Sequence, residues 1–325
     1  MFSNVVKVSL LIAIVITVAT TAGASEDKPQ LKIQPAEHVN AAGKEAMLAT
    51  APAGDRIVAV GDHGVILLSD DNGRTFHQAR TVPVSSTLTG VSFADARHGW
   101  AVGHWGVILA TSDGGDTWKI QRSDLTVDQP LFSVYFKNAR EGWAVGLWSL
   151  MLHTTDGGTN WLATQLPPPP GAKKADRNLY QIFPGRDGRI FIAAEKGYVL
   201  SSTDGQTWTY LDTGYRGSLW AGLALDDGTL LVGGLRGTLL HSEDQGQTWQ
   251  QLKSVTTSSI TGLAQMKDKK IIASALDGVA LTSNDNAQSF RVTQSVDRLQ
   301  YTGVIGNAEG RPVMLSVDGP TLRLP

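Results

Sequence analysis

The stretch TSDGGDTW, residues 111–118, contains two carboxylates, two glycines and a tryptophan within eight residues. Carboxylates on a glycine-rich loop are suited to Ca²⁺, although such a site takes roughly six to eight oxygen ligands. An acid beside an aromatic ring is also compatible with a sugar-binding loop. A third possibility is a turn in which an aspartate accepts hydrogen bonds from its own backbone. The number of copies in the chain decides among them.

Five further copies of this phrase follow at a regular spacing. They read SDDNGRTF (69–76), TTDGGTNW (154–161), SSTDGQTW (201–208), SEDQGQTW (242–249) and SNDNAQSF (283–290). Their final aromatic residues recur every 41 to 47 residues, and a period of this kind indicates a repeated supersecondary unit. Because no bidentate glutamate follows these loops, we interpret their aspartates as turn-stabilising residues rather than calcium ligands: Asp71, Asp113, Asp156, Asp204, Asp244 and Asp285.

Each repeat contains short β-prone runs separated by turn residues. In the second repeat these runs are GVSF (90–93), GWAVG (99–103) and VILAT (107–111), and a fourth strand is expected from Trp118 onward. A four-stranded unit of about 42 residues, repeated, is typical of a β-propeller. The sequence therefore predicts an all-β fold.

The number of units predicts seven blades. Six units end in the aromatic turn, and the last, residues 301–325, supplies three strands before the chain stops. We expect the N-terminal segment PQLKIQPAEH (29–38) to provide the missing outer strand and close the ring, which would remove two free sheet edges. The proline-rich segment PPPPGAKKADR (167–177) is expected to be a loop inserted between the third and fourth blades.

The N-terminus has the three parts of a secretory signal peptide. Lys7 precedes an apolar run at 8–20, and the small residues AGA at 22–24 follow. The run is shorter than the roughly 20 residues of a membrane span. We therefore expect a signal peptide at 1–24, cleavage near Ala24, and a single propeller domain at 25–325 in the periplasm or outside the cell. With no cysteine and a net charge of −2, neither disulfides nor bulk attraction to nucleic acid is expected.

The repeated turn resembles the Asp-box, or BNR repeat, of sialidases and related propellers. The longer phrases HGWAVGHWGVILATSDGGDTW and EGWAVGLWSLMLHTTDGGTNW resemble the photosystem II assembly and stability factor family, which also has members in non-photosynthetic bacteria. The resemblance covers about residues 40–320. It implies a non-enzymatic seven-bladed propeller that acts as an assembly factor and binds a partner protein through a basic, arginine-rich surface.

The chain departs from that family at its N-terminus. Cyanobacterial members usually carry a lipid-attachment cysteine after the signal peptide, whereas this sequence contains no cysteine. We therefore expect a relative from a non-photosynthetic bacterium, whose client is a membrane-protein complex or an extended segment of one. Direct insertion into the membrane is not expected, and the protein is expected to be a monomer.

Enzymatic chemistry is the main alternative. A sialidase clamps its substrate with three arginines, usually including one in an FRIP-type motif, and DRIVAVG (55–61) is only a strand that begins with an arginine. The histidines lack paired metal-ligand spacing such as H-x-x-x-H. We therefore expect no catalytic site, no metal and no cofactor. A sialidase-like glycosidase or a carbohydrate-binding propeller remains the alternative.

One position in the turns between second and third strands lacks the small residues that a structural turn needs. It reads His63, Trp105, Trp148, Lys196, Arg236, Asp277 and Asp318 from blade to blade. Exposed indole and guanidinium groups are typical of binding hot spots. With the neighbouring blade-to-blade loops, this position predicts a partner-binding face made of Trp105, Trp148, Arg177, Lys196, Tyr215, Arg216, Arg236 and Arg298.

Two alternatives to this face stay open. Trp105 and Trp148 could instead fold inward and pack between blades. The hairpins at the opposite end also carry basic residues, which could bind a partner or simply be solvated tips: Arg97, Arg140, Arg186, Arg189, Lys267, Lys269 and Lys270.

Overall fold

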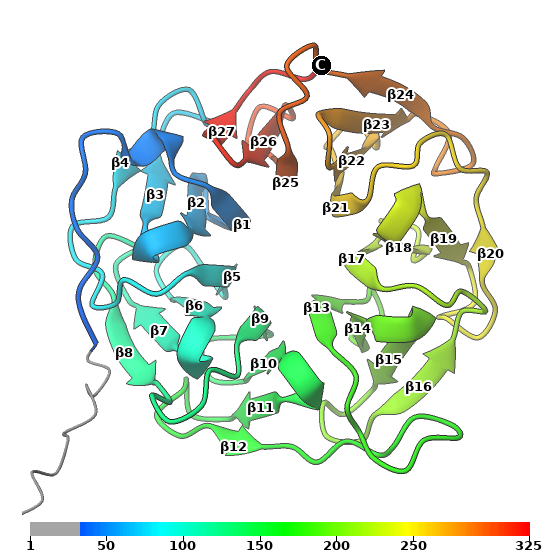
Figure 1. The fold of residues 1–325 in the computed structure, drawn as a ribbon, viewed down its shortest axis with the longest axis horizontal. Helices are drawn as coiled ribbons and strands as arrows, with labels where there is room; N and C mark the ends of the chain where they lie inside the picture. The colour runs from blue at the N-terminus through cyan, green and yellow to red at the C-terminus, as the bar shows by residue number, and fades with distance from the viewer. Residues whose placement is uncertain (1–32) are drawn as a thin grey trace, which may run out of the picture. The chain divides into compact units, whose positions relative to one another are not determined.

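The computed structural model describes residues 33–325, which form one compact unit (Figure 1). Seven antiparallel sheets are arranged around a central axis, so the prediction of a seven-bladed β-propeller is confirmed. The predicted signal peptide at 1–24 lies outside the described residues. Among residues 33–325, no helix has the length and apolar character needed to cross a membrane.

The strands of each blade run outward from the axis in chain order. The innermost strands are β1 (Met47–Ala53), β5 (Leu88–Phe93), β9 (Leu131–Phe136), β13 (Leu179–Pro184), β17 (Leu219–Ala224), β21 (Ile260–Gln265) and β25 (Tyr301–Gly306). The second strands are β2 (Arg56–Gly61), β6 (Gly99–Gly103), β10 (Gly142–Gly146), β14 (Ile190–Ala194), β18 (Leu230–Gly234), β22 (Ile271–Ala275) and β26 (Pro312–Ser316).

The outer half of each blade is shorter. The third strands are β3 (Ile66–Ser69), β7 (Ile108–Thr111), β11 (Met151–Thr154), β15 (Tyr198–Ser202), β19 (Leu239–Ser242), β23 (Val279–Ser283) and β27 (Gly319–Thr321). The fourth strands, present in six blades, are β4 (His77–Gln78), β8 (Lys119–Arg122), β12 (Leu162–Ala163), β16 (Thr209–Asp212), β20 (Gln250–Gln251) and β24 (Arg291–Gln294). The predicted loop at 167–177 lies between β12 and β13.

Short turns complete the fold. One, η1 (Ala42–Lys44), precedes the first blade. The others join second to third strands and are η2 (Asp62–Gly64), η3 (His104–Gly106), η4 (Leu147–Ser149), η5 (Glu195–Gly197) and η6 (Leu235–Gly237).

Burial explains why these sequences form middle strands. Every residue of β6, β10, β14, β18 and β22 is buried, because neighbouring blades cover both faces of the sheet. A strand covered on both faces reads as a continuous apolar run rather than an alternating one. Trp100 of β6 stacks on Phe136 of the next blade, with ring centroids 3.4 Å apart, and so joins two blades directly.

The Asp-box turns close the outer hairpins by a fixed set of hydrogen bonds. In the second blade, Asp113 Oδ1 accepts from the backbone N–H of Thr117 (2.9 Å) and the hydroxyl of Thr111 (2.8 Å), while Oδ2 accepts from the Thr117 hydroxyl (2.6 Å). Trp118, only 2 % exposed, donates from Nε1 to Gly115 O and packs against core residues of the first blade. The other five aspartates accept equivalent bonds from the residues around them.

The predicted closing strand is not present in the described part of the chain. The seventh sheet contains only β25, β26 and β27, and residues 33–38 form no strand. Instead, the Ala36 N–H donates to Val82 O (3.0 Å) and Gln78 Nε2 donates to Glu37 O (2.8 Å), so this segment follows the outer edge of the first blade. The prediction is therefore wrong for 33–38, and residues 29–32 lie outside the described range.

The physical reason lies in how the chain enters the ring. After residue 38 it turns through η1, which contacts β27, and passes directly into β1 at the axis. Pro320 in β27 has no N–H to offer a fourth strand, and proline is a common feature of edge strands. The seam is closed by side chains instead: Thr302 Oγ1 donates to Met47 O, Asn307 Nδ2 donates to Asn72 O (2.8 Å), and Leu315 is fully buried.

Removing the apolar contact at this seam should destabilise the whole ring. Leu315 shares a core cluster with Met47 and Leu67 of the first blade. We expect Leu315→Ala to lower the free energy of unfolding by about 2–5 kcal/mol, because a fully buried leucine leaves a cavity. Urea unfolding followed by circular dichroism measures this loss. An unchanged midpoint would show that the seam does not depend on this residue.

The Asp-boxes should make the propeller sensitive to acid. The Thr248 hydroxyl, the Thr248 N–H and the Ser242 hydroxyl lower the pKa of Asp244 from 3.8 to about 2, and the pKa values of Asp71 and Asp285 are likewise about 2. A carboxylate whose pKa is lowered by folding stabilises the folded state above its unfolded pKa, and this contribution is lost as the pH falls through the folded value. We therefore expect the free energy of unfolding to fall steeply between pH 4 and pH 2.

The variant Asp244→Asn isolates one box. It should be less stable than the wild type at pH 7 and should lose less stability between pH 4 and pH 2, measured by urea unfolding at each pH. Glu243→Gln is the matched control, because the Glu243 side chain is exposed and makes no hydrogen bond with a described residue. If Asp244→Asn followed the wild-type pH profile in parallel, this box would not contribute to acid unfolding.

Candidate functional site

The turns between second and third strands and the blade-to-blade loops lie at the same end of the propeller, which we call the turn face. Each of η2 to η6 contacts the innermost strand of the following blade. The turns therefore surround the mouth of the central channel, and residues from different blades meet there.

One position of these turns has a left-handed backbone in six blades. The φ angles lie between 53° and 61° at His63, Trp105, Trp148, Lys196, Arg236 and Asp277. A left-handed conformation costs a non-glycine residue roughly 1–2 kcal/mol. Non-glycine side chains therefore occupy this position although the backbone conformation favours glycine. Non-glycine residues in such conformations cluster at functional sites.

Polar side chains from the next blade hold three of these turns in place. The backbone N–H of Trp105 donates to Asp128 Oδ1 (2.7 Å), that of Trp148 to Asn178 Oδ1 (3.1 Å), and that of Arg236 to Ser259 Oγ (3.2 Å). Each bond fixes the turn relative to the strand that follows. The side chains at this position are thus presented from a rigid backbone.

The two tryptophans differ in exposure. Trp148 is 58 % exposed, which leaves most of its indole on the surface. Trp105 is half-buried and packs against the core that the first two blades share. Trp148 thus matches the predicted binding role more closely, and Trp105 lies nearer to the inward-packing alternative.

The basic residues of the turn face fall into two groups. Three have an acidic partner: Arg177 pairs with Asp176 (2.6 Å), Arg216 with Asp212 (2.9 Å), and Arg298 with Asp277 (3.6 Å). Arg177 is also mostly buried, with 15 % of its side chain exposed. Lys196 and Arg236 are exposed and form no ion pair with any residue between 33 and 325. These two, on neighbouring blades, are the cations most available to a ligand.

Tyr215 and Asp212 support the loop rather than project from it. The Tyr215 hydroxyl donates to Leu235 O (3.1 Å), and its ring is half-buried. The Gly214 N–H and the Arg216 guanidinium both hydrogen-bond to Asp212 and hold the pKa of this carboxyl below its usual value. The blade-to-blade loop is therefore ordered around Asp212.

The innermost strands add residues to this mouth that are not among the predicted site residues, although the sequence already places Trp220 near this face at the start of a strand. Near its beginning, each innermost strand has a register shift that leaves one residue without a partner in the second strand. Such a β-bulge re-aims a side chain. We call these residues the bulge ring: Leu48, Thr89, Phe132, Tyr180, Trp220, Thr261 and Thr302.

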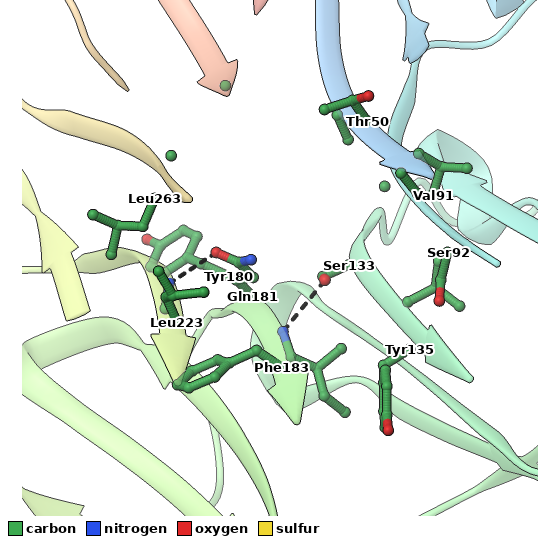
Figure 2. A pocket seen from close by; sticks show the side chains of 18 of the residues that line it. Thr50, Val91, Ser92, Ser133, Tyr135, Tyr180, Gln181, Phe183, Leu223 and Leu263 are labelled. Carbon is green, nitrogen blue, oxygen red and sulfur yellow. Dashed lines mark hydrogen bonds between the residues drawn. The ribbon is translucent and has the colours of Figure 1, made fainter. Parts of the chain in front are cut away.

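All seven members of the bulge ring line a central cavity of about 500 Å³. Figure 2 shows Tyr180 beside Gln181, with Ser133 and Tyr135 on a neighbouring strand. Arg186 is the single charged residue among those lining the cavity between positions 33 and 325, and the remainder are apolar, aromatic, hydroxyl-bearing or amide residues. The repeat offered a signal for the ring, because its members occupy the same register in each inner strand, as in LTGVSF (88–93), LFSVYF (131–136) and LWAGLA (219–224).

The opposite end of the propeller is largely satisfied internally. Arg186 pairs with Asp226 (2.5 Å), as does Lys269, while Arg189 pairs with Asp187 (3.5 Å) and Lys270 with Asp268 (3.4 Å). Arg97 Nε donates to Ser112 O (3.2 Å), and Lys267 Nζ donates to Ala308 O. Arg140 is exposed. In the described range, no three His, Asp or Glu side chains are grouped so that they could hold a metal ion.

The fold and the turn face define an Asp-box propeller in which the turns and the bulge ring surround the mouth of the central channel. Residues 78–209 match the family model described as photosynthesis system II assembly factor YCF48. This match confirms the predicted resemblance to the photosystem II assembly factor family. No curated protein matches the chain.

Solved structures match the fold over nearly the whole propeller. The structure described as YCF48 bound to D1 peptide is 20 % identical, with a TM-score of 0.69, and the match covers 89 % of this chain and 98 % of that one. YCF48 from Cyanidioschyzon merolae is 16 % identical, with a TM-score of 0.68 and coverage of 88 % and 96 %. The extracellular domain of the hybrid two component system BT4673 from B. thetaiotaomicron, at 11 % identity and a TM-score of 0.68, is matched over 39 % of that chain.

The contrast between Trp148 and Trp143 can be measured as stability. Trp143 is 1 % exposed, so Trp143→Ala should lower the free energy of unfolding by about 3–5 kcal/mol. Trp148→Ala keeps the same left-handed backbone and removes a mostly solvated ring, so we expect a change within about 0.5 kcal/mol. Urea unfolding of both variants tests this. A large loss for Trp148→Ala would identify its indole as a packing residue.

Proposed function

We propose that this chain is a non-enzymatic accessory or assembly factor that binds an extended segment of a membrane-protein client at its turn face. The observation that carries the proposal is the group formed by Trp148, Lys196 and Arg236. These three exposed side chains lie on left-handed turns of consecutive blades, and neither cation has an acidic partner among the described residues. Exposed tryptophan and arginine are the residues most enriched at binding hot spots.

The comparison with relatives supports a peptide ligand. A structure of the same fold is described as bound to D1 peptide, and the family model describes an assembly factor. We extend this role to the present chain as a proposal, with a client of its own.

The compartment in this proposal is the periplasm or the exterior of the cell. It rests on the signal-peptide pattern at 1–24 and on a sequence without cysteine, which needs no reducing environment. The sequence without cysteine also supports a source outside photosynthetic organisms, because the lipid-attachment cysteine of cyanobacterial members is missing. The proposal also includes a monomeric protein that binds its client through one mouth of the ring.

Charge reversal on the turn face should weaken client binding. The variant Lys196→Glu/Arg236→Glu replaces two unpaired cations by acids, and we expect at least about a tenfold loss of affinity, because like charges then face the ligand. Capture of solubilised membrane proteins from the source organism, followed by binding measurements with the extramembrane segments of the captured proteins, gives the readout. Circular dichroism melting checks that the variant remains folded.

The matched control is Lys137→Glu/Arg140→Glu. Lys137 and Arg140 are exposed in the first hairpin of the third blade, at the opposite end of the ring, and make no ion pair with a described residue. This control changes the net charge equally and should keep client capture. Equal loss in both variants would assign the effect to overall charge. Hydrolysis of a fluorogenic sialoside or specific glycan-array binding by the wild type would favour the carbohydrate alternative and contradict the proposal.

A further inference from the structure

The bulge ring is not uniform from blade to blade. Where it holds threonine, the hydroxyl connects two blades: Thr89 Oγ1 donates to Leu131 O (2.5 Å) and Thr261 Oγ1 donates to Tyr301 O (2.9 Å). Thr302 makes the same kind of bond across the closing seam. In these three blades the bulge residue therefore has a clear structural role.

Three consecutive blades hold aromatic residues at this position instead. Phe132, Tyr180 and Trp220 form what we call the aromatic arc. The rings of Phe132 and Tyr180 are stacked, with centroids 5.8 Å apart and planes 16° from parallel, and the Tyr180 hydroxyl lies 3.4 Å from Ser218 Oγ, next to β17. None of the three bonds to the backbone of the next blade as the threonines do. Their half-buried rings line the cavity at its mouth.

The exposed groups of the turn face border this arc. The turn that carries Trp148 contacts β13, which contains Tyr180, and the turn that carries Lys196 contacts β17, which contains Trp220. Arg236 follows on the next blade. An apolar platform is thus flanked on one side by unpaired positive charge, and no acid is among the described residues that line the cavity.

We propose that the aromatic arc is a subsite for an aromatic or large aliphatic side chain of an acidic peptide. In this arrangement the side chain packs against Tyr180 and Trp220 at the channel mouth, while flanking carboxylates face Lys196 and Arg236. The inference rests on the proposed function and deepens it, because it names the chemistry of the segment that is bound. Aromatic pairs contribute beyond their buried area, which suits such a platform.

The polar groups of the cavity favour a peptide side chain over a sugar. A sugar ring requires free, directed hydrogen-bonding groups beside an aromatic platform. Near the arc two of the acceptors are already occupied: Gln181 Oε1 accepts from the Gly222 N–H (2.9 Å), and Ser133 Oγ accepts from the Ile182 N–H (3.3 Å), as the dashed lines in Figure 2 show. The arc itself offers ring surface and few acceptors for sugar hydroxyls.

The variant Tyr180→Thr/Trp220→Thr, which we call the arc variant, removes two of the three rings of the arc with little risk to folding, because threonine occupies the same register in three other blades. Thr261→Ser is the matched control, since serine keeps the inter-blade hydroxyl. The probes are three capped synthetic peptides: GSDFDSG, GSDADSG without the aromatic ring, and GSKFKSG with reversed charge. Binding is measured by isothermal titration, and melting by circular dichroism.

We expect the wild type and Thr261→Ser to bind GSDFDSG at least about tenfold more tightly than either other peptide, because a hot-spot contact removed on either side produces a loss of this size. Tyr180→Thr/Trp220→Thr should lose this preference while melting near the wild-type temperature. Equal binding of GSDFDSG and GSDADSG, or no binding of GSDFDSG by the wild type up to about 1 mM, would overturn the inference. Glycan binding that disappears in the arc variant would also overturn it.

The outcome is separable from that of the proposed function. If the wild type captures a membrane-protein client and the arc variant captures it equally well, the arc inference fails and the proposed function stands. If the wild type captures no client at all, the proposed function fails, whatever the peptides show.

Discussion

The burial of the second strands on both faces is the constraint on which the rest of this structure depends. The residues of β6 and β10 are buried throughout, because each blade covers the faces of its neighbours. A blade by itself would expose this apolar surface, so the ring must close for any blade to be stable. Within residues 33–325, closure involves no strand from the N-terminal segment. Leu315, Met47 and the hydrogen bonds of Thr302 and Asn307 join the last blade to the first.

The same ring geometry creates the turn face. The second strand of a blade ends where the innermost strand of the next begins, so a left-handed turn and a β-bulge come together at six places around one mouth. Asp128, Asn178 and Ser259 hold three of these turns, and at three of the bulges a threonine donates a hydrogen bond to the next blade. Where blades three to five depart from this pattern, aromatic rings and unpaired cations appear together. A repeat protein can place function at such departures, because the remaining repeats supply the rigidity.

The Asp-boxes show the opposite use of polar residues. Asp113 and its counterparts have the composition of a ligand site, yet their oxygens are occupied by hydrogen bonds from the hydroxyls and backbone N–H groups of their own turns. These bonds keep the carboxylates ionised and ordered. The repeated acids thus stabilise the hairpins, whereas the cations without an acidic partner, Lys196 and Arg236, lie at the channel mouth.

The sequence by itself determined the repeat, and with it the fold. A period of 41 to 47 residues with strand-length apolar runs predicts a propeller, and the last unit indicates a seventh blade to which it supplies three strands, because these features depend on local patterning. It also indicated the position occupied by Trp148, Lys196 and Arg236. The closing strand at 29–38 could not be judged this way, since strand pairing across the ring depends on where the chain enters at η1. The ion pairs of Arg177 with Asp176 and of Arg216 with Asp212 are local in sequence, but they depend on side-chain conformations that the repeat pattern does not specify. Only the tertiary structure separated Trp148 from Trp105 by exposure and assembled Phe132, Tyr180 and Trp220 into one arc, because these relations arise between blades that are about 40 residues or more apart in sequence.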